Sequence, residues 1–146
     1  MAQENGPRFV HIGEVPPHQP VVQMHGERRV AVHLQVLDWS PERFIAYTRY
    51  DPGLILSRHC HKSDFTVFII AGEVEVGGRS CPAGTLIMLD KDKYFGPLIA
   101  GPEGCTLLES YAGDVTSVHE SDEAYHALLA ERGIVPVHHE GEGGGE

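Results

Sequence analysis

His59 and His61, separated only by Cys60, are the residues of this sequence whose chemistry is easiest to interpret. The flanking residues favour an extended strand, in which side chains two positions apart point to the same face. Two neutral imidazoles that point into one interior form a chelating pair for a divalent transition metal. The spacing therefore predicts that His59 and His61 are metal ligands and that Cys60 faces away from the metal. The alternative is a pair of core histidines whose ring nitrogens are satisfied by hydrogen bonds.

The sequence from Gly53 to Gly78 resembles the first conserved motif of the cupin superfamily. In that motif a glycine precedes a His-x-His, and the strand that follows ends at a second glycine, here Gly72. A Pro-Ala-Gly turn at residues 82–84 resembles the start of the second motif. The resemblance spans roughly residues 37–113. Within it, the sequence is most similar to the small single-domain cupins that include 2,4'-dihydroxyacetophenone dioxygenase and acetylacetone-cleaving enzymes.

Two positions depart from the ligand set that this resemblance implies. Phe65 stands where the motif usually has a glutamate ligand, and Phe95 stands where the second motif often has a third histidine. Asp64 lies one position from the glutamate slot. Its carboxylate would complete a set of two histidines and one carboxylate, which is typical of non-haem iron sites. The alternative for Asp64 is a side chain that caps a turn.

Tyr94, next to Phe95, is the candidate catalytic residue. Its phenol could ligate the metal, hydrogen-bond a bound dioxygen or act as an acid, and the alternative is a wall residue packed beside Phe95. Glu109 is a further carboxylate, provided that its side chain turns inward. His33 and Arg49 lie on early strands that can line the pocket mouth in a jelly roll, although surface positions are the commoner outcome.

The resemblance implies a metal-dependent enzyme with Fe(II) as the favoured metal and Zn, Mn or Ni as the others. Such a site suits a dioxygenase that cleaves the carbon–carbon bond beside a carbonyl in a small diketone or hydroxyketone. One alternative is a non-redox metal cupin that works as an isomerase, lyase or hydrolase. Another is a small-molecule-binding or sensor module without catalysis. Apolar surface for a small-molecule substrate would come from Phe44, Phe65, Phe68 and Phe95.

Composition excludes several other functions. The chain has 146 residues, enough for one domain with a real core, and its formal net charge of −10 would repel a nucleic-acid backbone. It has no apolar run long enough to cross a bilayer and no segment like a secretion signal at its start, so we expect a cytoplasmic protein without membrane partners. The three cysteines form no CxxC pattern, and we expect reduced, buried thiols.

The pattern along the chain predicts an all-β fold. Strands are expected at residues 30–37, 44–50, 54–61, 66–71, 73–76, 84–89 and 105–111, the 84–89 strand being buried, with turns at residues 38–42, at Asp51-Pro52-Gly53 and at Gly77-Gly78. One helix should begin at Ser121 and end at Gly133, with Tyr125, Leu128 and Leu129 on its apolar face. Many short strands with a single late helix indicate a sandwich or barrel, and the resemblance to the cupin motifs implies a double-stranded β-helix, the cupin jelly roll.

The same pattern divides the chain into four segments. Residues 1–29 form an N-terminal arm that a partner subunit could exchange, and residues 30–116 form the cupin barrel. Residues 117–133 contain the C-terminal helix, and residues 134–146 form a flexible, acidic, glycine-rich tail. Because an exposed sheet edge or an arm favours self-association, we expect a homodimer.

Overall fold

The computed structural model describes residues 6–119 and 122–139. A short 3-10 turn at Ile12–Glu14 precedes the first strand, and one helix, α1, spans Asp122–Glu131. The strands are β1 (Val21–His25), β2 (Arg28–Ser40), β3 (Arg43–Tyr50), β4 (Ile55–Leu56), β5 (His59–His61), β6 (Phe65–Val76), β7 (Arg79–Pro82), β8 (Leu86–Leu89), β9 (Leu98–Tyr111), β10 (Ser117–His119) and β11 (Ile134–His139).

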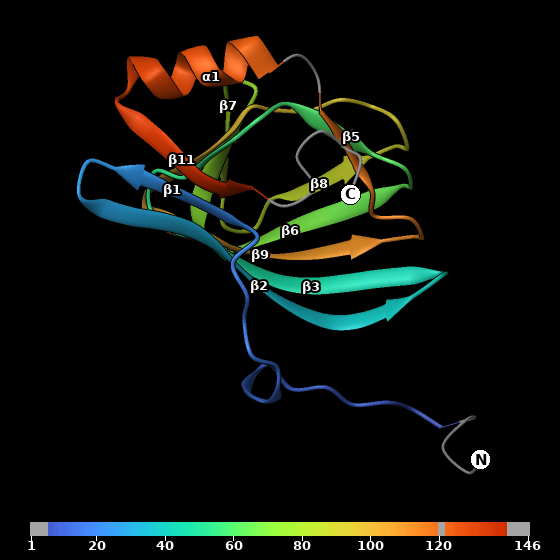
Figure 1. The fold of residues 1–146 in the computed structure, drawn as a ribbon. Helices are drawn as coiled ribbons and strands as arrows, with labels where there is room; N and C mark the ends of the chain where they lie inside the picture. Colours follow the sequence, from blue (N-terminus) through green and yellow to red (C-terminus); the bar gives the residue numbers. More distant parts are fainter. Residues whose placement is uncertain (1–5, 120–121, 140–146) are drawn as a thin grey trace.

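Most strands belong to one antiparallel sheet in the order β11-β1-β2-β3-β9-β6-β7, with β4 added to β9 and β8 added to β6. A second, two-stranded sheet joins β10 to β5. Figure 1 shows the large sheet curling on itself, with the histidine-bearing strand β5 beside its concave side. The predicted all-β class with one C-terminal helix is confirmed.

The core lies inside this curl and follows from strand alternation. In β6 the side chains of Phe65, Val67 and Ile69 are buried, while the residues between them are exposed. Leu107 of β9 pairs with Ile69 and is likewise buried. Period-two alternation thus selects which residues face the interior, as it does in any sheet with one buried face.

Helix α1 packs on the outside of the sheet through Tyr125 and Leu129, which form a second apolar cluster with Ile55 and Ile134. The Tyr125 hydroxyl donates a hydrogen bond of 3.1 Å to the Ile55 carbonyl oxygen, so its polar end is satisfied although the ring is buried. The predicted apolar face of the helix is confirmed. Its predicted start, Ser121, lies outside the described residues.

Gly72, the glycine that closes the first motif, is required by a close approach of two backbone segments. Its φ is +73°, and a Cβ at this position would clash with the Gly104 carbonyl oxygen. Any other residue would push β6 away from β9 at the bulge that separates two stretches of regular pairing.

Several predicted boundaries differ from the structure. The segments 66–71 and 73–76 are one strand, β6, because a bulge at Gly72 carries the pairing through the glycine. The turn predicted at residues 38–42 shrinks because β2 continues to Ser40. Strand β8 is present, but it is half-exposed rather than buried, because it lies at the side of β6 with nothing described over its outer face.

The two ends of the chain contribute to the sheet more than predicted. Residues 134–139, predicted as the start of a flexible tail, form β11 and pair with β1, and β1 itself lies inside the predicted arm. The β-branched pair Ile134-Val135 favours this strand, and a bulge in the β1 pairing accompanies Pro136. The rest of the predicted tail, residues 140–146, lies outside the described residues.

Residues 12–18 of the predicted arm contact their own sheet. Gln35 of β2 donates hydrogen bonds to the carbonyl oxygens of Ile12 and Val15, and His18 forms a bridge with Leu34.

Cys60, Cys81 and Cys105 are buried, unpaired thiols, as predicted. In the described part of the chain, no helix has both the length and the apolar character to span a membrane.

Candidate functional site

His59 and His61 lie side by side on β5 at the wall of a cavity of about 180 Å³ inside the curled sheet. Both residues are buried, and their ring centroids are 5.0 Å apart with an interplanar angle of 85°. The predicted same-face placement of the two imidazoles is therefore what the structure shows, because positions i and i+2 of an extended segment point the same way.

A backbone carbonyl orients each ring. His59 Nδ1 lies 2.7 Å from the Ser57 carbonyl oxygen, and His61 Nδ1 lies 3.1 Å from the Val115 carbonyl oxygen. Because a carbonyl oxygen can only accept, Nδ1 carries the proton in both neutral rings and Nε2 keeps its lone pair. Metal-binding histidines use this same arrangement, in which a hydrogen bond at one nitrogen sets the tautomer that presents the other.

Burial also keeps both imidazoles neutral. It lowers the pKa of His59 to about 3, and the neighbouring His61 is the next largest cause. Burial likewise lowers the pKa of His61 to about 4, against an opposing hydrogen bond to the Val115 carbonyl. Near neutral pH the two rings are therefore unprotonated bases, the state in which imidazole binds a metal ion.

Phe65 and Phe95, which stand where the cupin motifs usually have a glutamate and a histidine ligand, pack against these rings. The Phe65 ring meets His61 edge to face at 4.7 Å, and the Phe95 ring lies 4.8 Å from that of His59. Phe95 and His59 also exchange backbone hydrogen bonds of 3.0 and 2.9 Å. In place of two further ligands, the site has an apolar wall that shields the histidine pair.

The structure does not bring Asp64 to the histidine pair. Asp64 is exposed, and its carboxylate accepts a hydrogen bond of 2.8 Å from the Lys91 backbone amide. It lines a surface hollow on the other side of the start of β6, because Phe65, the next residue, takes the inward position. This bond ties Asp64 to the turn after β8, 27 residues along the chain, and is not the local Asx cap that was the alternative.

Tyr94 is also placed apart from the pair. Phe95, not Tyr94, lines the inner cavity, and the Arg58 guanidinium lies over the Tyr94 ring at 5.8 Å from its centroid. Because neighbouring residues of an extended segment face opposite ways, Tyr94 takes the outward position when Phe95 turns inward.

His119 and His139 join the site although neither was predicted. Strand β10 pairs with β5 so that His119 lies opposite His59, with ring centroids 5.3 Å apart. The ring centroid of His139, at the end of β11, lies 5.3 Å from that of His119, and both residues line the inner cavity. A serine hydroxyl approaches each nitrogen of His119: Ser57 Oγ at 2.7 Å from Nδ1 and Ser117 Oγ at 3.3 Å from Nε2.

A half-buried acid, Glu109, lies beside His61. The Tyr111 hydroxyl donates a hydrogen bond of 2.8 Å to Glu109 Oε1 and lies 3.5 Å from His61 Nε2. Burial raises the pKa of Glu109, although the Tyr111 and Thr48 side chains oppose this shift. Burial and the Glu109 carboxylate together raise the pKa of Tyr111 well above 10. The Glu109 side chain turns inward, which is the condition under which the sequence analysis offers it as a further carboxylate of the site.

The inner cavity opens into a wider mouth of about 990 Å³. His61, Glu109 and Tyr111 line both spaces, so the mouth leads directly to the histidine pair. Trp39, 71% exposed, stands at the rim, and its ring meets Phe44 edge to face at 5.7 Å. Within residues 6–119 and 122–139, no three His, Cys, Asp or Glu side chains form a ready metal-binding group.

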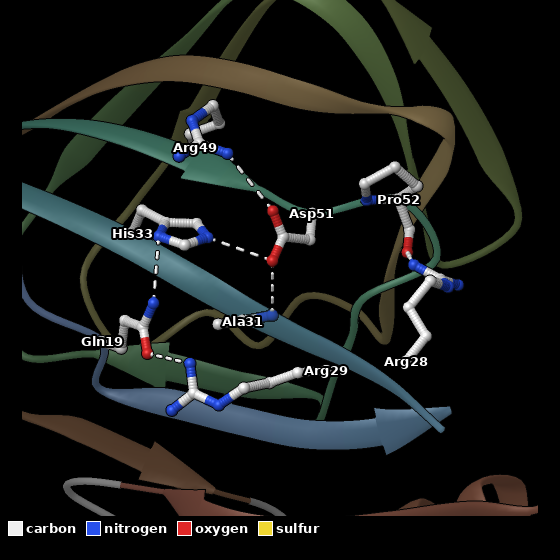
Figure 2. A network of polar contacts seen from close by, with 8 residues as sticks. All are labelled: Gln19, Arg28, Arg29, Ala31, His33, Arg49, Asp51 and Pro52. Carbon is white, nitrogen blue, oxygen red and sulfur yellow. Dashed lines mark hydrogen bonds and ion pairs between the residues drawn. The ribbon is translucent and has the colours of Figure 1, made fainter. Parts of the chain in front are cut away.

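His33 and Arg49 do not line either space. Figure 2 shows that both contact Asp51, with His33 Nε2 at 3.0 Å and an Arg49 nitrogen at 3.2 Å from its carboxylate oxygens. The same carboxylate accepts a hydrogen bond of 2.9 Å from the Ala31 amide, and Gln19 lies 3.3 Å from the other nitrogen of His33. This network holds the turn after β3 and has no part in the cavity.

The fold is similar to those of several solved structures. A candidate acetylacetone dioxygenase from Methylibium petroleiphilum PM1 superposes with a TM-score of 0.63 at 16% identity, over 85% of this chain and 95% of that one. The polyketide cyclase RemF from Streptomyces resistomycificus gives a TM-score of 0.63 at 15% identity, over 86% and 94% of the two chains. An RmlC-like cupin from Shewanella frigidimarina NCIMB 400 gives 0.60 at 16% identity, over 82% and 96%.

Sequence comparison adds nothing to this result, because no protein-family model and no curated protein matches the chain. The structural similarities cover most of the chain and of each of these three neighbours. The chain therefore has the double-stranded β-helix fold of the cupin superfamily.

Proposed function

We propose that this chain is a metal-dependent enzyme that acts on a small carbonyl compound, with oxidative cleavage of the carbon–carbon bond beside the carbonyl as its reaction. The observation that carries the proposal is the pair of neutral imidazoles, His59 and His61, each held by a backbone carbonyl at the wall of an apolar cavity. The shared fold with a candidate acetylacetone dioxygenase supports the substrate class, a small diketone or hydroxyketone.

The donors present fit a divalent transition metal. His59 and His61 would hold the ion through Nε2, and His119, across the strand pair from His59, is the next imidazole available. Imidazole nitrogen suits iron, zinc and nickel, and Fe(II) is favoured here because the proposed reaction consumes dioxygen. A bound iron would supply Lewis acidity toward the carbonyl and a route for electrons to oxygen.

The other cavity residues have roles that do not depend on the metal. Phe65 and Phe95 bind the apolar part of the substrate and exclude water from the imidazoles. Glu109, whose pKa is raised by burial, is placed with Tyr111 to take or return the proton of an enolising carbonyl compound. The mouth beside Trp39 admits the substrate.

Metal content and oxygen consumption test the proposal together. Full-length protein purified without oxygen and loaded with Fe(II) should hold about one metal ion per chain. It should consume oxygen when pentane-2,4-dione or a hydroxyacetophenone is added, as measured with an oxygen electrode. The His59→Ala and His61→Ala variants should lose both metal and oxygen uptake, because each removes one arm of the chelate.

His126→Ala is the matched control, since His126 is exposed on α1 and takes no part in the cavity. This variant should retain metal and activity. A native protein that binds no metal under these conditions, and that behaves like the double variant His59→Ala, His61→Ala, would remove the catalytic proposal.

A second candidate reaction is supported by the Glu109–Tyr111 pair. A half-buried carboxyl with a raised pKa, linked to a phenol beside the imidazoles, is suited to proton transfer without any redox step. Isomerases, lyases and cyclases need such a group, and the fold is shared with the polyketide cyclase RemF. Zinc, manganese or nickel would serve this reaction.

The two reactions differ in their need for oxygen. A proton-transfer enzyme loaded with Zn(II) should exchange the acidic C–H protons of a diketone for deuterium in D₂O under argon faster than the uncatalysed exchange, which NMR detects, and Glu109→Gln should return the rate to the uncatalysed value. Oxygen uptake by the Fe(II) form with no such exchange by the Zn(II) form would favour the dioxygenase.

A further inference from the structure

Two of the four inward positions of β3 carry hydroxyl groups that the proposed chemistry does not use. The buried residues of this strand alternate as Phe44, Ala46, Thr48 and Tyr50, so all four side chains point into the curled sheet. Thr48 is 0% exposed and Tyr50 is 7% exposed. Most residues at such positions are apolar, and a hydroxyl there needs a hydrogen-bond partner.

Neither hydroxyl has a hydrogen-bond partner in the described part of the chain. Thr48 Oγ1 is fully buried and makes no hydrogen bond with a described residue. The Tyr50 hydroxyl likewise makes none there, and Tyr50 lines the inner cavity. A buried donor without a partner costs free energy, and a polar group in the cavity would remove that cost. The two hydroxyls therefore indicate that a polar atom occupies the space beside Tyr50 in the working protein.

Glu109 supplies an acceptor next to these hydroxyls. It lines the same cavity from β9, and the Tyr111 hydroxyl bonds to its Oε1, which leaves Oε2 for a ligand. The Thr48 side chain is close enough to lower the pKa of Glu109. Burial, and after it the Glu109 carboxylate, raises the pKa of Tyr50 well above 10, so Tyr50 keeps its proton near neutral pH and can donate it.

We propose that Tyr50 and Glu109, supported by Thr48, form a binding subsite for a hydroxyl group of the substrate. A hydroxyl uses both sides of this subsite, because it accepts a hydrogen bond from Tyr50 and donates one to Glu109. A second keto oxygen can only accept, and it would leave the Glu109 carboxylate without a donor. The subsite therefore selects a hydroxyketone over a diketone. This selection rests on the proposed function, in which the cavity binds a carbonyl compound.

The subsite lies within reach of a ligand held at the histidine pair. Tyr111 connects the two, since its hydroxyl lies 2.8 Å from Glu109 Oε1 and 3.5 Å from His61 Nε2. Tyr50 and both histidines line one cavity of about 180 Å³, which is smaller than the pockets that hold drug-sized ligands. One small molecule can therefore place its carbonyl at the histidines and its hydroxyl at Tyr50.

Charge excludes an anionic group at this position. Among the described residues that line the inner cavity there is no Lys or Arg. A ligand carboxylate or phosphate beside Glu109 would therefore lose its hydration without gaining a counter-ion, and it would face a group of the same charge. An uncharged hydroxyl carries no such penalty.

Ligand binding to the full-length protein under argon tests the subsite. Hydroxyacetone and butanone form a matched pair of probes, because a hydroxyl in the first replaces a methyl group in the second. In ligand-observed NMR titrations the native chain should bind hydroxyacetone at least ~10-fold more tightly than butanone. The preference should be present with and without added Zn(II), since no residue of the subsite is a proposed metal ligand.

Tyr50→Phe should bring the ratio of the two affinities to about one, because hydroxyacetone loses its donor while butanone binds as before. Thr48→Val should reduce the ratio as well, and it covers the case in which Tyr50→Phe does not fold. Tyr47→Phe is the matched control and should keep the native ratio, since Tyr47 lies on the other face of β3 and lines neither the inner cavity nor the mouth.

Stability provides a readout that a structural role would move. The free energy of unfolding of ligand-free Tyr50→Phe should not fall below that of the native chain, because the hydroxyl that it removes has no partner in the folded protein. A loss of stability, measured by urea unfolding, would show that this hydroxyl is a structural group and would count against the subsite.

Equal binding of the two probes by the native chain would overturn the proposal, with water as the polar group beside Tyr50. A native ratio that survives in Tyr50→Phe would overturn it too, because the hydroxyl would then be recognised elsewhere. Neither outcome bears on metal content or oxygen uptake, which are measured separately. Failure of those two tests with the hydroxyl preference intact would remove the proposed reaction and keep the subsite.

Discussion

At the scale of single residues, the two β5 histidines make the stability of the metal-free protein depend on pH. Their folded-state pKa values, about 3 for His59 and about 4 for His61, lie below the ordinary value of 6.5. The unfolded chain therefore binds these protons first, and the stabilising contribution of the neutral rings is present above pH 6.5 and is lost as the pH falls toward 4. Glu109, whose pKa is raised, acts in the opposite direction above its ordinary value of 4.5.

We therefore predict that the free energy of unfolding of the chelator-treated protein falls steadily from pH 6.5 to pH 4.5. Each buried histidine contributes a slope of up to ~1.4 kcal/mol per pH unit. In His61→Gln the slope should be smaller by about that amount, as urea unfolding at several pH values would show. An unchanged slope in His61→Gln would mean that this ring is not buried neutral.

We predict that the Tyr111 hydroxyl stabilises the Glu109 carboxylate, in addition to the packing that the Tyr111 ring provides. Tyr111→Phe keeps the ring but removes the hydroxyl that donates to Glu109 Oε1. Because that hydrogen bond lowers the pKa of Glu109, the pKa should rise further in the variant, and stability should fall by about 1–3 kcal/mol. Infrared titration of the Glu109 carboxyl would measure the first effect. Tyr47→Phe, on the outer side of β3, should produce neither change.

At the scale of elements, helix α1 is held by a small cluster that can be tested separately from the cavity. Leu129 is 1% exposed and packs with Ile55 and Ile134, so Leu129→Ala should lower the free energy of unfolding by ~2–5 kcal/mol. Glu131→Ala, exposed on the same helix, should change it by less than ~0.5 kcal/mol. Chemical denaturation compares the two. Equal effects would show that α1 does not depend on this cluster.

Element positions could be predicted from the sequence wherever a local pattern decides them. Strand β3 follows from its aromatic and β-branched run, and the inward placement of His59 and His61 follows from strand alternation. The hairpin between β6 and β7 follows from Gly77-Gly78. These features depend on neighbours in the chain, which is why the sequence is sufficient for them.

The other half of the site depends on pairing between distant strands. His119 reaches His59 only because β10 pairs with β5, and His139 reaches His119 only because β11 pairs with β1. Neither pairing has a local sequence signal. Because glycine-rich residues follow His139, the pattern assigns residues 134–139 to a flexible tail rather than to a strand. Asp64 illustrates the converse, since a shift of one position at the start of β6 sends its carboxylate to the opposite face.

At the scale of the whole molecule, the homodimer proposed from the sequence has a thermodynamic consequence. A dimer is stabilised by mass action, so the midpoint of thermal unfolding should rise with protein concentration. Calorimetry at concentrations about 100-fold apart should show this rise for the native chain. A midpoint that is independent of concentration in the native chain would count against the dimer.

The position of β11 matters for how the protein is handled. Its last residues, His138 and His139, line the wide mouth of the cavity, whereas residues 6–11 run away from the curled sheet in Figure 1. A polyhistidine purification tag fused after residue 146 would thus start only a few residues from the opening and could compete for the ions under study. A cleavable tag at the amino end avoids this interference in metal-content measurements.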